Sequence, residues 1–296
     1  MRDVGIHQGV QMQGYHTWEA ASSSAMHHMK RSPAYAHYKA HTFTPPTPAT
    51  ELGTAFHYLL LEPHTFRDRY AMQPGPTSAY LKHCADKKLK STQGWTRSPL
   101  YTEEISTPQY VGRELLKPFD WERVHAMRDA ALSHELGEVI AREVEAGNAI
   151  IEASVMAHDT EHDVPRKCRP DCLLPARGMA IDLKSTRAVN PQGFSFECHK
   201  YSYHMTAAWY LDTLNWLPNG THYEHYAFLA TQSDAPFEPR GYVMGQFSIE
   251  RGRMEYQYHL KRWAQCKRDG VWPAGPNTIE EIDLPEWAFN REIGDE

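Results

Sequence analysis

Two aspartates and a lysine within one short segment could carry out chemistry together. The segment RPDCLLPARGMAIDLKST contains Asp171, Asp182 and Lys184. Both aspartates lie in apolar runs that predict strands, and the residues ARG between the runs suit a hairpin connection. Pairing of the two strands would bring the carboxylate of Asp171 beside that of Asp182. Because side chains alternate along a strand, Asp182 and Lys184 are expected to face the same side.

Neighbouring carboxylates repel each other unless a cation lies between them. A metal site that is made of carboxylate oxygens and contains no cysteine favours Mg²⁺, and Mn²⁺ can take the place of Mg²⁺. Such a metal lowers the pKa of a bound water and stabilises charge on a phosphate, and Lys184 could orient that water. We therefore predict that Asp171, Asp182 and Lys184 are catalytic and that both aspartates bind the metal. The alternative is a surface hairpin with an Asp–Lys ion pair.

The surrounding sequence predicts an α/β fold of the mixed kind, with a central mixed sheet flanked by helices. Residues 121–148 have the spacing of one amphipathic helix that ends at Gly147. The predicted strands are 149–157, 166–175, 178–186, 222–233 and 241–250. The other predicted helices are 17–40, 51–63, 194–217 and 251–270. The first of them is expected to be capped by one of Ser22 to Ser24 and to be broken by a turn at Ser32-Pro33.

With 296 residues, of which 41% are hydrophobic, the chain can bury a large core. We expect one nuclease domain over residues 1–296. Its parts would be a helical segment 1–120, a catalytic core 121–265 in the order helix, three strands, helix, strand, and an acidic tail 266–296.

The net charge of -6 is concentrated at the end of the chain. Residues 277–296 hold seven acids and one arginine, so the other 276 residues balance at zero. An acidic tail can lie away from a basic groove, and the total charge therefore does not exclude a nucleic-acid partner.

Cellular location can also be judged from composition. No run approaches the roughly 18 apolar residues of a membrane helix, and the first residues lack the apolar region of a signal peptide. We expect a soluble cytoplasmic protein without a membrane partner. Five scattered cysteines argue against a disulfide framework and are expected to be free thiols.

Six segments in order along the chain carry a family resemblance: SSSAMHHMKRSPAYAHYKA, ELGTAFHYLLLEP, CRPDCLL, IDLKST, YHMTAAWYLD and LPEWA. The chain resembles the PD-(D/E)XK nuclease superfamily and, within it, the exonuclease VIII (RecE-type) nucleases of phages and prophages. The resemblance implies a restriction-endonuclease-like core and a Mg²⁺-dependent 5′-to-3′ exonuclease on linear double-stranded DNA, in a bacterial or phage-infected cell. It also implies a ring-shaped homo-oligomer, and 3′ single-stranded overhangs for a single-strand annealing recombinase in DNA recombination.

The resemblance assigns roles to individual residues. His57, in a G-x-x-x-H pattern, would be a metal ligand, and the main-chain carbonyl of Leu183 would complete the metal shell. Asp171 and Asp182 match the metal-binding acids, and Lys184 matches the catalytic lysine. One position departs from the family: Thr206 stands where related nucleases often carry glutamine, although the tyrosine that follows it, Tyr210, is retained.

Other residues have weaker signals. Possible DNA contacts are Lys30, Arg31, Lys87, Lys88, Thr206 and Tyr210. Lys87 and Lys88 belong to a basic segment, residues 73–100, that is otherwise typical of a solvated loop. Glu152 could be a further acid of the metal site, although a cross-strand polar partner is the favoured interpretation. The residues HDTEHD could bind a metal but are more typical of a polar turn.

Two alternative functions remain open from the sequence. The same core could belong to an endonuclease, which would cut closed circular DNA as readily as linear DNA. The chain could also be a non-catalytic DNA-binding or interaction module on a nuclease scaffold. The presence of Asp171, Asp182 and Lys184 together argues against the second alternative, because a module without activity has no chemical need for all three.

Overall fold

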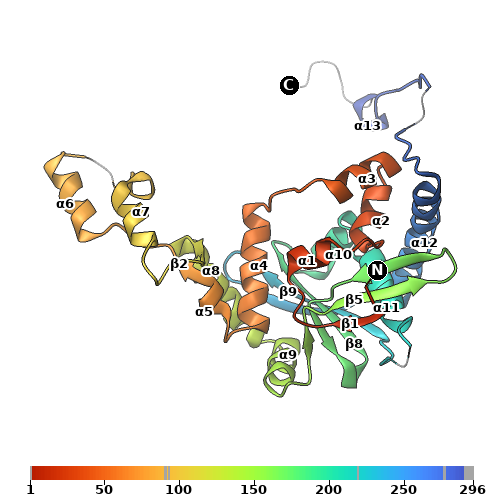
Figure 1. The fold of residues 1–296 in the computed structure, drawn as a ribbon, viewed down its shortest axis with the longest axis horizontal. Helices are drawn as coiled ribbons and strands as arrows, with labels where there is room; N and C mark the ends of the chain where they lie inside the picture. Colours follow the sequence, from red (N-terminus) through yellow and green to blue (C-terminus); the bar gives the residue numbers. More distant parts are fainter. Residues whose placement is uncertain (1, 90–91, 93, 219, 276–277, 290–296) are drawn as a thin grey trace.

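The computed structural model describes residues 2–89, 92, 94–218, 220–275 and 278–289. At its centre lies a five-stranded mixed sheet with helices on both sides (Figure 1), as the sequence predicts. The strand order is β10-β9-β8-β7-β4. These strands are β4 (Ile150–Ile151), β7 (Cys172–Leu174), β8 (Met179–Thr186), β9 (His225–Gln232) and β10 (Pro239–Val243). Strands β8 and β9 are parallel, and every other pair is antiparallel.

Two smaller sheets accompany the central one. Strands β1 (Gly5–His7), β5 (Ser154–Asp159) and β6 (Val164–Cys168) form an antiparallel sheet. Strands β2 (Tyr70–Met72) and β3 (Glu114–Leu116) form a parallel pair. Residues 1–120 are therefore mostly helical but also supply three short strands.

Alternating side chains bury both faces of the central sheet. Ala180, Tyr226 and Phe228 pack in one core cluster with residues of α11 (Tyr203–Asn215) and α12 (Gln246–Asp269). Ile181 and Leu183 point the other way, into a cluster with residues of α4 (Pro48–Leu61), α8 (Pro118–Leu132) and α9 (Glu135–Glu145). Burial on both faces is typical of sheets whose parallel strands are covered by helices.

Two predicted long helices are each divided in the structure. Residues 121–148 form the end of α8 and all of α9, because His134 begins a new helix by accepting a hydrogen bond from the N–H of Leu136 (3.1 Å). Residues 194–217 form α10 (Pro191–Lys200) and α11, separated by Ser202 with a φ of 56°. A left-handed residue cannot continue a right-handed helix, so the chain turns there.

Three predicted strands also differ. Residues 149–157 divide into β4 and β5, which belong to different sheets. Residues 166–175 divide into β6 and β7, which belong to different sheets, and Pro170 lies in the break, where it cannot donate to a ladder. Residues 241–250 contain only the end of β10, because α12 begins at Gln246. The predicted helix 251–270 is thus longer than expected and ends at Gly270, whose φ is 67°.

The predicted cap among Ser22 to Ser24 is confirmed, and the predicted break at Ser32-Pro33 is the start of a second helix. Ser22 caps α2 (Ser23–Met29) by accepting a hydrogen bond from Ala25 N–H at 3.2 Å. Ser32 caps α3 (Pro33–His41) in the same way, with Pro33 in the first turn. The remaining helices near the N-terminus are α1 (Met12–His16) and α5 (Phe66–Arg69).

Helices α6 (Ser78–Asp86) and α7 (Pro99–Ile105) lie at one end of the molecule, far from the central sheet (Figure 1). They pack on a small cluster of Tyr80, Cys84 and Trp95. The last element in the described part of the tail is α13 (Glu286–Phe289). All five cysteines are free. In the part of the chain that the structure describes, no helix is long and apolar enough to cross a membrane.

Candidate active site

The free edge of β8 positions Asp171. Strand β7 pairs with β8 only as far as Ile181, so beyond this point β8 is paired with β9 alone. Asp171 lies just before β7, and its Oδ2 accepts a hydrogen bond from the main-chain N–H of Leu183 at 2.7 Å. The break between β6 and β7 therefore places this carboxylate against the strand that carries Asp182 and Lys184.

Helix α4 brings His57 to the same edge. At Gly53 an added Cβ would lie 2.9 Å from Oγ of Ser185, so glycine allows the helix to approach β8 closely. One turn later, Nδ1 of His57 lies 3.4 Å from Oδ2 of Asp171. The G-x-x-x-H pattern thus combines a close approach with a side chain aimed at Asp171.

Glu152 joins these two residues, contrary to the favoured interpretation from sequence. It lies outside the strands, between β4 and β5, with a φ of 49°. Its N–H donates to the carbonyl of Asp171 (3.0 Å), and its carboxylate accepts from Nε of Arg169 (2.9 Å). His57, Glu152 and Asp171 each offer a ligand atom, all within 4.8 Å of one another. The one sequence signal was a lone acid in the apolar run AIIEASVMA.

Asp182 and Lys184 form the other half of the site. They lie on one face of β8, as strand alternation predicts, and Nζ of Lys184 makes an ion pair with Oδ2 of Asp182. The same Nζ lies 4.7 Å from the ring centre of Tyr203. Asp182 is not one of the three residues whose ligand atoms cluster within the described chain, so its predicted role as a metal ligand stays a prediction.

The electrostatics of the cluster fit a divalent cation. Burial raises the pKa of Asp171 well above its usual range, and the charges of Asp182 and Glu152 raise it further. Burial also raises the pKa of Glu152, against the opposing effect of Arg169. Burial and the Lys184 ammonium lower the pKa of His57 to about 4, so its imidazole is neutral at pH 7. A neutral imidazole beside two crowded carboxylates is a donor set that a divalent cation would stabilise.

The main chain of Leu183 lies beside both His57 and Asp171. Its N–H donates to the carboxylate of Asp171, and its backbone opposes the lowering of the His57 pKa. The predicted use of the Leu183 carbonyl as a metal ligand stays a prediction.

The six possible DNA contacts do not gather in one place. Nζ of Lys30 donates to Oγ of Ser202 (3.0 Å) and pairs with Glu255 (3.5 Å), and Arg31 stacks over Tyr35. Lys87 and Lys88 are exposed at the end of α6, away from the sheet (Figure 1). Lys90, in the same basic segment, lies outside the described residues.

Thr206 and Tyr210 share a face of α11 and are partly buried. Tyr210 meets the ring of Tyr226 edge-on. Burial raises the pKa of Tyr210, and the charge of Asp182 adds to the rise, so this hydroxyl lies near the site. Thr206 is not among the residues whose ligand atoms cluster in the described chain.

The residues HDTEHD form the turn of the β5–β6 hairpin. Asp159 is buried there and pairs with Arg166 (3.3 Å) and His162 (3.2 Å). Arg166 is fully buried and stacks over Trp209. Asp159 in this segment therefore has a structural role.

Comparison with known proteins agrees with this geometry. Residues 22–285 match the family described as a PDDEXK-like domain of unknown function (DUF3799). The chain belongs to this family. A similar fold is found in a crystal structure of a candidate exonuclease from Eubacterium rectale, at 11% identity and a TM-score of 0.55, covering 97% of this chain and 100% of that one. No curated protein gives a significant match.

Membership of the PDDEXK-like family confirms the predicted superfamily and its fold. The chain therefore carries a nuclease-type domain with a possible metal-binding group of His57, Glu152 and Asp171. The narrower resemblance to exonuclease VIII stays a prediction.

Proposed function

We propose that this protein is a Mg²⁺-dependent exodeoxyribonuclease that degrades linear double-stranded DNA from 5′ to 3′. The observation that carries the proposal is the cluster of His57, Glu152 and Asp171 beside the Asp182–Lys184 pair. The resulting 3′ overhangs would serve a single-strand annealing recombinase, and a ring-shaped homo-oligomer would keep the enzyme on its DNA. These last features follow from the exonuclease VIII resemblance.

Each residue of the site would have a separate role in phosphodiester hydrolysis. A bound Mg²⁺ would supply an acidified water and charge stabilisation at the phosphate. His57, Glu152 and Asp171 would hold it, and the N–H of Leu183 keeps Asp171 oriented. Burial alone would lower the pKa of Lys184, but Asp182 and Asp171 outweigh burial and raise it. Lys184 is therefore protonated at neutral pH and acts by donating a hydrogen bond or by neutralising charge on the phosphate.

The test is digestion of end-labelled linear duplex by the purified protein, with Mg²⁺ or with EDTA. We expect progressive loss of the 5′ label, only with Mg²⁺, while closed circular duplex is spared. Asp171→Asn and Lys184→Gln should each slow digestion about 100-fold or more, as for loss of a group acting in the transition state. Matched controls are Asp163→Asn, in an exposed turn, and Lys267→Gln, near the end of α12.

Three results would contradict the proposal. Absence of metal-dependent digestion would exclude the enzyme. Cleavage of closed circles at a rate comparable to linear duplex would favour the endonuclease. Release of the 3′ label before the 5′ label would reverse the direction of degradation.

A further inference from the structure

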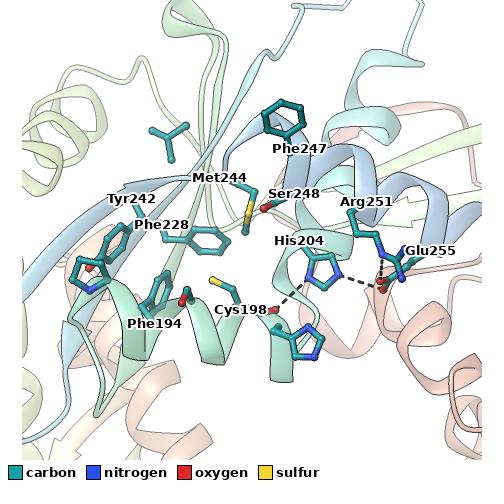
Figure 2. Close-up of a pocket in the computed structure, with 14 residues that line it drawn as sticks. Phe194, Cys198, His204, Phe228, Tyr242, Met244, Phe247, Ser248, Arg251 and Glu255 are labelled. Carbon is teal, nitrogen blue, oxygen red and sulfur yellow. Dashed lines mark hydrogen bonds and ion pairs between the residues drawn. The ribbon is translucent and has the colours of Figure 1, made fainter.

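A hollow opens beside α10 and the start of α12 (Figure 2). Its volume is about 520 Å³, within the range of small-ligand pockets. It lies between α10, the strands β9 and β10, and the start of α12. One end is aromatic, with Phe194, Phe228 and Tyr242, and the other end carries His204, Arg251 and Glu255. We call it the aromatic pocket.

We propose that the aromatic pocket binds an unstacked nucleotide of single-stranded DNA next to the candidate active site. The inference rests on the proposed function and specifies the form of DNA that the site holds. Its support comes from three features: exposed aromatic surface, a continuous path of rings to Lys184, and excess positive charge at the polar end.

The pocket has a floor of buried rings, Phe194 and Phe228, and one exposed ring, Phe247, on which a base can stack. Phe194 and Tyr242 stack with ring centres 5.0 Å apart, and Phe194 meets Phe228 edge-on at 5.5 Å. At the mouth, the side chain of Phe247 is 89% exposed and Val243 is 58% exposed. Aromatic side chains that stack single-stranded bases do so without sequence preference, because every base has a π-face.

A single ring separates the pocket from the catalytic lysine. Nζ of Lys184 lies 4.7 Å from the ring centre of Tyr203. That ring is 5.7 Å from Phe228 and 6.3 Å from Phe194, both of which line the pocket. Tyr201, which is exposed, stacks on Tyr203 at 5.7 Å. A strand whose phosphate lies at Lys184 would therefore have the exposed ring of Tyr201 available to a neighbouring base, on the same path of rings that leads to the pocket.

The polar end has the charge that a phosphate requires. Glu255 accepts hydrogen bonds from Nε of Arg251 (3.0 Å) and Nε2 of His204 (3.3 Å), and Nζ of Lys30 lies 3.5 Å away. Two permanent cations thus face one carboxylate. The side chain of Arg251 is 68% exposed, so it can also reach a DNA phosphate. This arrangement favours a nucleotide over an apolar peptide.

The test measures binding without cleavage. A short single-stranded oligonucleotide that carries 2-aminopurine is titrated with the full-length protein in EDTA, and its fluorescence and anisotropy are recorded. Phe247→Ala should weaken binding about tenfold, within the range for loss of one stacked base, and Arg251→Gln should also weaken it. The matched control is Phe43→Ala, because Phe43 is 84% exposed but lies outside the pocket.

Unchanged affinity in Phe247→Ala, or an equal loss in Phe43→Ala, would overturn the inference. So would a Phe247→Ala variant that loses self-association in sedimentation but keeps its affinity for the oligonucleotide, since the surface would then be a subunit contact. The two proposals fail separately. A protein that binds DNA through Phe247 but never cleaves it contradicts the nuclease, whereas a nuclease indifferent to Phe247 contradicts only the pocket.

Discussion

The ionised carboxylate of Asp171 lowers the stability of the metal-free protein. Its carboxylate is partly buried beside Glu152 and Asp182, and its pKa is raised. A carboxyl whose pKa is higher in the folded than in the unfolded state binds more protons when folded. Its ionised form therefore destabilises the fold at any pH above the raised pKa, and this cost disappears as the pH falls.

We accordingly expect Asp171→Asn to raise the free energy of unfolding of the metal-free protein at pH 7, because the amide carries no charge to be buried. Mg²⁺ should raise the melting temperature of the unsubstituted protein but not of this variant. Calorimetry with and without Mg²⁺ checks both statements. Asp163→Asn, in which a fully solvated acid is replaced, should behave like the unsubstituted protein; a Mg²⁺ shift that survives Asp171→Asn would contradict the assignment.

Lys167 is a second buried charge, with a different consequence. Its side chain, 7% exposed, donates to the carbonyls of Tyr15 (3.0 Å) and Trp18 (2.8 Å). Burial lowers its pKa to about 8. Between this value and the pKa of the unfolded chain, the unfolded state binds more protons, so the free energy of unfolding should rise with pH.

We predict that this rise, between pH 8 and about 10, amounts to roughly 2 to 3 kcal/mol. It is measured as the difference between urea denaturation of the unsubstituted protein and of Lys167→Met, which lacks the titrating group but retains the buried methylenes. Parallel pH profiles for the two proteins would show that Lys167 keeps an ordinary pKa.

At the scale of elements, the close crossing of α11 and α12 depends on one glycine. An added Cβ at Gly252 would lie 2.2 Å from the carbonyl oxygen of His204, which belongs to the first turn of α11. The main chain of α11 cannot rotate away from this Cβ as a flexible side chain could, so the two helices would have to move apart. The crossing fixes α11 and hence Tyr203, the ring between Lys184 and the aromatic pocket.

Gly252→Ala should therefore lower the free energy of unfolding by about 1 to 3 kcal/mol, as overpacking does, although alanine favours helices. Gly275→Ala is the control, because no atom lies within 4 Å of its added Cβ. Chemical denaturation of both variants checks the prediction, and equal stability of the two would show that the helices can separate without cost.

Across the whole molecule, charge is unevenly distributed along the chain. The tail residues 277–296 carry the entire net charge of -6. Ile279, Ile282 and Leu284 in this tail are largely exposed. The described part of the tail therefore adds little to the core, and the negative charge of the tail contributes a repulsive field toward DNA.

Replacing Glu280, Glu281, Asp283 and Glu286 by their amides should strengthen binding to duplex DNA in EDTA several-fold at low salt, because a surface field acts over roughly 10 Å at 0.1 M salt. The gain should vanish in high salt, and the melting temperature should stay the same. A change in melting temperature would reveal that these acids are part of the folded core.

The sequence by itself determined the features that depend on local periodicity and local hydrogen bonding. The strand with Asp182 and Lys184 on one face, the cap at Ser22, the break at Ser32-Pro33, and the spacing of Gly53 and His57 all appear as predicted. Each of these features follows from backbone geometry within a few residues. The mixed α/β fold was predicted from the order of the helices and strands along the chain.

Only the tertiary structure decided which distant groups meet. Glu152 reaches the cluster because a left-handed backbone conformation and Arg169 turn it toward Asp171. The division of residues 121–148 into two helices reflects packing as well as capping, since Gly137 fits against the carbonyl of Ala131, where an added Cβ would lie 1.9 Å away. Such contacts join residues through close packing and burial, which periodicity along the chain does not encode.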